Sequence, residues 1–190
     1  MESSFLAMAR PGAAAFTGQM TEPTHYSPDL VQVVKAIAKR SFCTLATVSP
    51  SGRPHVAGVL YQAIGTTLYV NMSRDSRKGR NIAENPHVAV SIPIRRLPVG
   101  GPPSTVQFQG HAELLGFDDP DIVRMVGAGE LKNITSHGEL DHPDGCFVRI
   151  TPLRRMTTYG LGMSLLTLIR DPLHAGGTVE VEAQPRGETR

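Results

Sequence analysis

The alternation of apolar and polar residues changes its period along the chain, and each change predicts a new element. Apolar residues recur at helical spacing over residues 28–40, which predicts an amphipathic helix. Ser27 is expected as its N-cap, with Pro28 at the first helical position and Asp29 in the first turn. The chain is therefore expected to enter its fold through one short helix.

After this helix the pattern turns to that of β-strands. Three β-rich runs cover residues 42–48, 54–62 and 67–72. Residues 49–52 (SPSG) and the turn at Gly65 separate these runs and suit tight antiparallel hairpins. The three runs are therefore expected to form consecutive antiparallel strands.

The rest of the chain alternates strands with short helices. The pattern predicts a helix at 75–84, strands at 87–94 and 105–115, a helix at 118–129, and one bent or two short strands at 145–160, broken near Pro152. Asp75 or Ser76 is expected to cap the first of these helices, and Asn85-Pro86 to end it. Short connections between strands favour a mainly β fold, an antiparallel barrel with flanking helices, over a doubly wound parallel sheet. No GxGxxG motif follows the first strand, which argues against a Rossmann dinucleotide site.

Composition limits the class of protein. The 190 residues carry a net charge of +2 and are 40% hydrophobic, as expected for one soluble globular domain that does not bind nucleic acid. No apolar run reaches about 18 residues, so no membrane span is expected. Cys43 and Cys146 lie in apolar runs and are expected to be buried free thiols in a reducing, cytoplasmic compartment.

The two ends of the chain differ from its middle. Residues 1–26 lack the continuous apolar segment of a signal peptide and are expected to form a flexible leader. Residues 27–160 contain no linker and are expected to form one domain. Residues 161–190 are expected to form a C-terminal tail that is partly ordered at best.

The predicted helix at 75–84 carries the strongest chemical signal. Four cations fall within seven residues at its start: Arg74, Arg77, Lys78 and Arg80. The first turn of a helix offers unpaired N–H groups and a positive dipole end, so this segment suits an anion such as phosphate. Lys78 shares a helix face with Ile82, so it is the cation expected to point inward. A solvated basic helix is the alternative, and the charge pattern alone does not decide between the two.

Other polar residues are candidates for ligands or catalytic groups. The spacing of His137, His142 and Cys146 matches no zinc pattern, so a solvated loop is preferred there to a metal site. His55 and His111 each lie on a predicted strand, as barrel or cleft residues, and His55 is the better functional candidate.

Four pieces of the sequence, in this order and spacing, resemble the split β-barrel flavin and deazaflavin oxidoreductases, the pyridoxamine-5′-phosphate-oxidase-like family. They are the "LATV…SGRPHV" hairpin, a strand ending in a short polar run, the "S-x-K-x-x-N-I…NP" helix and the "V-x-F-x-G-x-A" strand. The resemblance covers about residues 30–155. It implies a six- or seven-stranded antiparallel split β-barrel that forms a homodimer, with the cofactor in a groove between the subunits.

The resemblance also implies a set of cofactor-binding residues. The cofactor phosphate would be held by Ser76, Arg77, Lys78, Arg80 and Asn81. The ring would lie along His55, Val56, Ala57, Gly58 and Val59, and the ribityl side along Asn71, Met72 and Ser73. The ring or its chain would also meet Gln107 and Gln109, and the partner subunit would supply Tyr159 and Gly160. No catalytic residue is assigned, because in such proteins the cofactor carries the hydride.

The implied function is an oxidoreductase that transfers a hydride between coenzyme F-420, a deazaflavin, or FMN and an unknown small organic substrate. The segment "TTYGLGM" and the extra cations Arg95 and Arg96 favour the deazaflavin. A non-catalytic carrier of a flavin, haem or lipid in the same groove is the alternative. A pyridoxamine-5′-phosphate oxidase is a third reading, against which the chain after residue 160 lacks the Arg/His-rich closing pattern of such enzymes.

Overall fold

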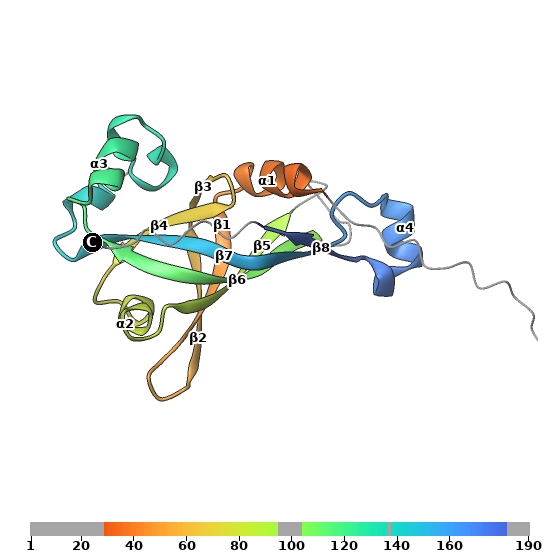
Figure 1. Ribbon diagram of the computed structural model, residues 1–190, viewed down its shortest axis with the longest axis horizontal. Helices are drawn as coiled ribbons and strands as arrows, with labels where there is room; N and C mark the ends of the chain where they lie inside the picture. The colour runs from red at the N-terminus through yellow and green to blue at the C-terminus, as the bar shows by residue number, and fades with distance from the viewer. Residues whose placement is uncertain (1–28, 95–103, 137, 182–190) are drawn as a thin grey trace, which may run out of the picture.

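In the computed structural model, which describes residues 29–94, 104–136 and 138–181, one curled antiparallel sheet is flanked by short helices (Figure 1). The elements are α1 (Leu30–Ala38), β1 (Phe42–Val48), β2 (Pro54–Leu60), β3 (Gln62–Ile64), β4 (Thr67–Ser73), α2 (Arg77–Glu84), β5 (His87–Ile94), β6 (Ser104–Leu115), α3 (Pro120–Gly127), β7 (Gly145–Tyr159), α4 (Leu165–Arg170) and β8 (Gly176–Glu180). Single 3₁₀ turns lie at Lys132–Ile134, Glu139–Asp141 and Pro172–His174. No helix in these ranges is long and apolar enough to cross a membrane.

The strand order within the described ranges is β2-β1-β5-β6-β7-β4-β3, with β8 added beside β7. All of these pairs are antiparallel. The first half of β7 pairs with β4 and its second half with β8, while β6 runs along its other side. The predicted antiparallel, mainly β fold is therefore confirmed. The predicted number of six or seven strands is too low, because the run at 54–62 divides into β2 and β3 and because β8 forms beyond residue 160.

The predicted break near Pro152 is a bulge inside one continuous strand. The pairing of β6 with β7 shifts register between Phe108 and Gly110, and Gly110 lies opposite Pro152. A side chain at Gly110 would stand 2.9 Å from the Thr151 carbonyl oxygen, so the two backbones approach closely here. A bulge accommodates a proline that cannot donate to the ladder, which allows β7 to continue to Tyr159.

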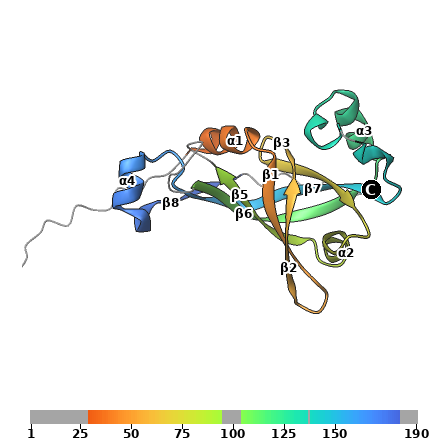
Figure 2. The same ribbon diagram turned by 180° about the vertical axis from the view of Figure 1, so that it is seen from behind.

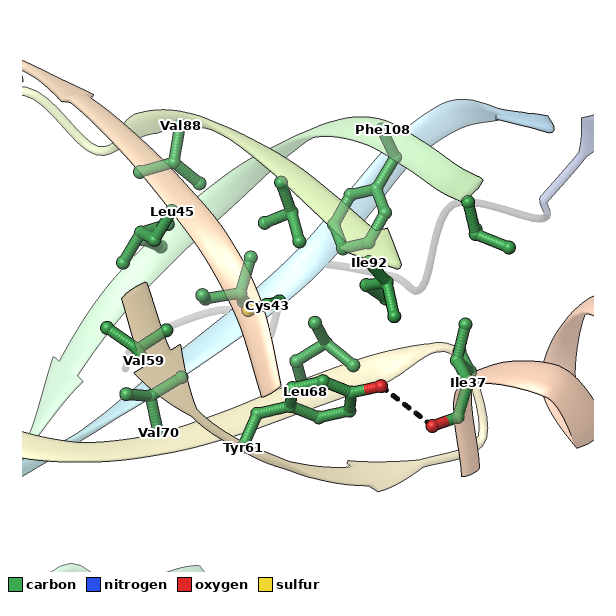
Figure 3. Packing of buried hydrophobic residues seen from close by; sticks show 14 of the residues in the cluster. Ile37, Cys43, Leu45, Val59, Tyr61, Leu68, Val70, Val88, Ile92 and Phe108 are labelled. Carbon is green, nitrogen blue, oxygen red and sulfur yellow. Dashed lines mark hydrogen bonds between the residues drawn. The ribbon is translucent and has the colours of Figure 1, made fainter. Parts of the chain in front are cut away.

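The main core lies on the inner face of the curled sheet (Figure 3). Cys43, Leu45 and Ile92 are fully buried there, and Cys43 and Cys146 are both buried free thiols, as predicted. The helix α1 closes one end of this core, where the Tyr61 hydroxyl donates to the carbonyl of Ile37 at 2.8 Å.

The start of α1 differs from its prediction. The N-cap is Asp29, whose carboxylate accepts from the Gln32 N–H at 2.7 Å, and the helix begins at Leu30. Ser27 and Pro28, the predicted cap and first residue, lie outside the described residues. An aspartate competes well for the capping position because its oxygen reaches the free N–H groups of the first turn.

The outer face of the sheet is covered unevenly. The helix α3, capped by Asp119, packs over the start of β7, where Ile122 and Met125 meet Tyr69 and Phe147 in a second apolar cluster. The helix α4 lies at the opposite end of the molecule from α3 in both views (Figures 1 and 2). Between these helices, the outward-facing residues of β1, β5 and β6 are half-buried or exposed.

Candidate functional site

The start of α2 is seated directly on the end of β4. Ser76 is the N-cap, and its hydroxyl accepts from the Gly79 N–H at 3.2 Å. The Ser76 N–H donates to the carbonyl of Ser73, also at 3.2 Å. A Cβ at Gly79 would lie 2.3 Å from the Arg74 carbonyl oxygen, so only glycine allows this approach. The capping hydroxyl keeps its own proton to donate, and a helix start of this kind can accept an anion.

The cations around this helix start are disposed differently from one another. Arg77 is exposed, while Lys78 is half-buried. Burial raises the pKa of the Cys146 thiol, and the nearby positive charges of Arg74 and Lys78 lower it by a smaller amount. Lys78 is thus less exposed than Arg77, and its charge, like that of the exposed Arg74, acts on Cys146 at the paired ends of β4 and β7. The Arg80 guanidinium turns back and donates to the carbonyl of Asp75.

Asn81 has a structural role that the sequence did not indicate. Its side chain is only 5% exposed, and its amide nitrogen donates to the Thr47 hydroxyl at 3.0 Å. Thr47 lies on the inner face of β1 and is itself buried. The amide that the resemblance assigned to the phosphate therefore anchors α2 to the sheet instead of facing solvent.

The predicted ring-binding residues of β2 divide between the two faces of an edge strand. His55, Ala57 and Val59 lie opposite inward residues of β1, whereas Val56 and Gly58 face outward. The Nδ1 atom of His55 is buried and has no hydrogen-bond partner. A Cβ at Gly58 would meet the ring of Phe42 at 2.8 Å, so this ring covers the outer side of Gly58.

The end of β4, which leads into α2, carries one further unsatisfied amide. Met72 packs into the core at 7% exposure, so its side chain does not line an open site. Asn71 and Ser73 are half-buried on the opposite face of the strand. The Nδ2 atom of Asn71 is buried without a hydrogen-bond partner.

His55 lies opposite Thr47, the residue that anchors α2, and Asn71 lies two residues before Ser73, on which α2 is seated. Their unsatisfied atoms lie on opposite faces of the sheet, His55 inward and Asn71 outward. Leaving such an atom buried without a partner costs about 1–3 kcal/mol, which a polar ligand would recover. The hydroxyls of Thr67 and Ser104 are also unpaired, elsewhere in the described residues. The donors of this corner are cations, a hydroxyl, an amide and helix N–H groups, which fit a cofactor that carries a phosphate and a polar chain.

A second candidate region is an open groove of about 1010 Å³ on the outer face of the sheet. Strands β1, β5, β6 and β7 line it, with the polar side chains of Gln107 and Gln109 and the exposed apolar side chain of Leu153 among its residues. The strand registers place Gly58, Thr44, Ser91, Gln107 and Thr157 in one row across five strands. The exposed Val56 extends this face to the β2 edge.

No residue of α2, β2 or β4 lines this groove. Ala112 donates to the carbonyl of Pro86, directly after α2. Gln107 lies five residues further along β6 and Thr105 seven, which corresponds to about 16 Å and about 23 Å. Tyr159 pairs with Thr105, so within one chain Tyr159 lies at this larger distance from the end of α2, the helix that carries Lys78.

Gly160 serves the packing of α4. Its φ is +64°, and a Cβ would meet Leu168 of α4 at 2.9 Å and the Ser104 hydroxyl at 3.0 Å. Gly160 is buried by these contacts, while Tyr159 is half-buried at the end of β7. Within one chain Gly160 therefore supports the packing of α4, while Tyr159 pairs with Gly176 of β8.

Several residues of the groove were not predicted. They are Thr44, Ser91, Arg154, Arg155 and Thr157. The alternation in the β1 and β5 sequences shows that Thr44 and Ser91 share a face with their strand neighbours, but only the pairing of the strands puts them in one row. The candidate metal ligands of the loop before β7 do not come together in the described residues. Cys146 is in the core and His142 is exposed, while His137 lies outside the described residues.

Comparison with known proteins gives the family. A model of the pyridoxamine 5′-phosphate oxidase family matches residues 31–156. The chain belongs to this family. A pyridoxine/pyridoxamine 5′-phosphate oxidase of Alkalilimnicola ehrlichii is 47% identical over 57 residues, a match that covers 28% of this chain and 28% of that protein. The chain therefore matches well under two thirds of the length of this curated relative.

Similar solved structures confirm the split-barrel fold. The heme storage protein HutZ of Vibrio cholerae superimposes with a TM-score of 0.60 at 22% identity, covering 71% of this chain and 98% of that one. An FAD-binding protein of Mesorhizobium loti gives a TM-score of 0.53 at 20% identity, covering 67% and 90%. At these identities the likeness concerns the fold, and flavin-binding and haem-binding proteins both have it.

Proposed function

We propose that the protein binds FMN with its phosphate at the start of α2 and catalyses hydride transfer between that flavin and a small organic substrate. The observation that carries the proposal is the start of α2, where Arg74, Arg77, Lys78 and Arg80 surround a helix N-terminus capped by Ser76. The buried polar atoms of His55 on strand β2 and Asn71 on strand β4, which lack hydrogen-bond partners, add to it. Membership of the pyridoxamine 5′-phosphate oxidase family supports it.

The residues of the corner have distinct tasks in this proposal. The Ser76 hydroxyl and the free N–H groups of the first helical turn donate to the phosphate, while Lys78 and Arg77 neutralise its charge. Asn81 holds the helix in place through Thr47. The bound flavin supplies the hydride chemistry, and the protein positions its ring and keeps water from it.

We place the second half of the site on a partner copy of the chain. The groove carrying Gln107 and Gln109 is open, and it is separated from α2 within one chain. Exposed apolar side chains of Phe42, Val56 and Leu60 border the same face. A homodimer that pairs these faces would bring Gln107, Gln109 and Tyr159 of one subunit to the α2 corner of the other.

FMN is our first choice over coenzyme F-420. Both carry a ring, a ribityl chain and a phosphate, so the α2 corner accepts either. The FAD-binding protein among the similar structures supports a flavin. The deazaflavin, which the sequence favoured, stays a prediction to be tested beside FMN, and Arg95 and Arg96 lie outside the described residues.

Haem binding is the second candidate, and the groove favours it. The groove volume of about 1010 Å³ is large, and Arg154 and Arg155 at its border suit the two carboxylates of a haem. The similarity to HutZ points the same way. This reading puts the ligand on the outer face of the sheet and leaves the α2 corner unused.

One titration separates these readings. The purified chain is titrated with FMN and with F-420 by fluorescence anisotropy, and with hemin by absorbance. Lys78→Ala is compared with Lys35→Ala, a change at an exposed lysine of α1. The proposal predicts FMN binding that weakens about tenfold or more in Lys78→Ala alone. Tight F-420 binding with the same loss would move the protein to the deazaflavin branch. Hemin binding unaffected by Lys78→Ala, with no flavin binding, would overturn the proposal.

Turnover is tested separately from binding. Photoreduced FMN on the protein is offered to a panel of small carbonyl, quinone and alkene substrates. Substrate-dependent reoxidation under anaerobic conditions is expected. In a separate assay, the protein with oxidised FMN is offered pyridoxamine 5′-phosphate in air, so that the flavin accepts two electrons from the amine and passes them to O₂. Binding without any turnover would identify a flavin carrier, and formation of pyridoxal phosphate would identify a pyridoxamine-phosphate oxidase.

A further inference from the structure

Two histidines face each other on the outer surface of the sheet, apart from the α2 corner. His87 of β5 and His111 of β6 are directly opposed in the antiparallel register. Their ring centroids are 6.3 Å apart with the ring planes at 89°. Both side chains are exposed, and the next row along the strands holds Ala89 and Gln109 of the groove.

The separation of the two rings fits a shared metal ion. A transition-metal ion binds an imidazole nitrogen at about 2.0–2.1 Å, which puts the ion about 3 Å from the ring centre. Two imidazoles on one ion therefore have centroids about 5–6 Å apart, depending on the angle at the metal. The observed 6.3 Å reaches this range after a small rotation of either side chain.

The backbone around the pair is fixed, so little order has to be gained on binding. Strands β5 and β6 pair without interruption from His87 to Ile94. On the side away from the groove, the Glu113 carboxylate is held by the Arg149 guanidinium at 2.6 Å. Glu113 is thus engaged and leaves the two imidazoles as the protein ligands, with water completing the coordination. In the described ranges no set of three or more metal-binding side chains gathers at one place.

We propose that His87 and His111 bind one divalent transition-metal ion, such as Ni²⁺, Zn²⁺ or Cu²⁺, across strands β5 and β6. Imidazole nitrogen is a preferred ligand for these ions, and Cu²⁺ is expected to bind most tightly. The site lies at the end of the groove, beside Gln109, and it does not depend on the flavin proposal.

The test uses the full chain freed of metal and any cleavable tag. Zn²⁺ and Ni²⁺ are titrated against the protein in competition with a chromogenic chelator. His87→Ala and His111→Ala are compared with His142→Ala and His174→Ala, two changes at exposed histidines elsewhere in the chain. One ion per chain is expected, with affinity reduced about tenfold or more by either change in the pair and unaltered by either control.

Two outcomes would overturn the proposal. One is the absence of stoichiometric binding in the parent protein. The other is binding that His87→Ala and His111→Ala leave intact, which would mean an adventitious ion only. Thermal unfolding checks that the variants are folded, and added Zn²⁺ should raise the unfolding midpoint of the parent but not of either pair variant.

Discussion

The α2 corner and the groove on the outer face are built in opposite ways. In the corner, side-chain directions are fixed by packing: Gly79 lies against a backbone carbonyl, Asn81 donates to Thr47, and Ser76 caps the helix. In the groove, side chains from neighbouring strands, most of them small or polar, line an open hollow on the outer face of the sheet. The corner is therefore preorganised to hold a ligand, while the groove is a surface that becomes a site only when something is placed on it.

Substitutions in the two regions are therefore expected to have different effects. Changes in the corner are expected to affect folding stability and ligand binding together, because the same contacts support both. Changes in the groove are expected to affect binding with little effect on stability, because exposed side chains contribute little to it.

The largest effect is expected at Gly79. In Gly79→Ala the new Cβ would lie 2.3 Å from the Arg74 carbonyl oxygen, so the helix start has to move away from β4. We expect a loss of about 1–3 kcal/mol in the free energy of unfolding, together with loss of FMN binding. Denaturant unfolding and anisotropy measure the two.

Gly127 provides the matched control for this change. It lies in α3, and a Cβ there would meet nothing within 4 Å. Gly127→Ala should leave FMN binding unaltered and should not lower stability. A stable Gly79→Ala protein that binds FMN normally would show that the helix start is not the preorganised site described above.

The anchor between Asn81 and Thr47 is expected to be the next most sensitive contact. Asn81→Ala removes the bond to the Thr47 hydroxyl and leaves that buried group unsatisfied, at a cost of about 1–3 kcal/mol in the free energy of unfolding. When Thr47→Val is added to Asn81→Ala, it should lower the free energy of unfolding much less than it does in the parent protein, because the Asn81 amide that it would leave unpaired is already absent. Strictly additive effects of the two changes would contradict the anchor.

The buried thiol at the start of β1, near Tyr61 and the α1 end of the core, predicts a loss of stability at alkaline pH. Burial raises the pKa of the Cys43 thiol from its ordinary value of 9.0 to about 12. The thiol stays protonated in the folded protein, while the unfolded chain ionises above about pH 9, so folding stability is intact below pH 9 and falls as pH rises toward 12. The loss attributable to this group should reach about 1 kcal/mol near pH 10, and Cys43→Ala should unfold with a shallower dependence on pH in this range. An equal slope in both proteins would contradict a buried, neutral thiol.

The smallest effect on stability is expected in the groove. Gln107 is exposed, so Gln107→Ala should change the free energy of unfolding by no more than about 0.5 kcal/mol. FMN affinity should nevertheless fall, because the partner subunit's groove is proposed to complete the site. Unaltered FMN affinity would confine the cofactor to the α2 corner.

The local signals in the sequence were enough for most of the elements. Ser76 as a cap, Asn85 at the end of α2, and the strand runs around Cys43 and Val90 are set by residues close together in the chain, and each lies where it was predicted. The short, glycine-rich β8 was missed because its pairing with β7 is a tertiary contact without a strong local pattern.

The site was predictable in part for the same reason. The cations of α2 are adjacent in sequence, so their gathering at one helix start could be foreseen. The inward turn of Asn81 toward Thr47 depends on how α2 docks on β1, and helical spacing does not encode that. The row that joins Thr44, Ser91 and Gln107 depends on strand register, which only the assembled sheet defines.

The central claim is that one subunit supplies the phosphate corner and the other supplies the groove. Its most direct test is to co-express Lys78→Ala and Gln107→Ala chains that carry different tags, purify the mixed dimer, and count its FMN sites by anisotropy. If the two residues act in one site from different chains, each mixed dimer has one intact site and one doubly altered site. High-affinity binding should then return to about one half of the sites in the mixed dimer, although neither parent variant binds tightly. A mixed dimer that binds no better than its parents, or a protein that is monomeric when FMN is bound, would contradict the account.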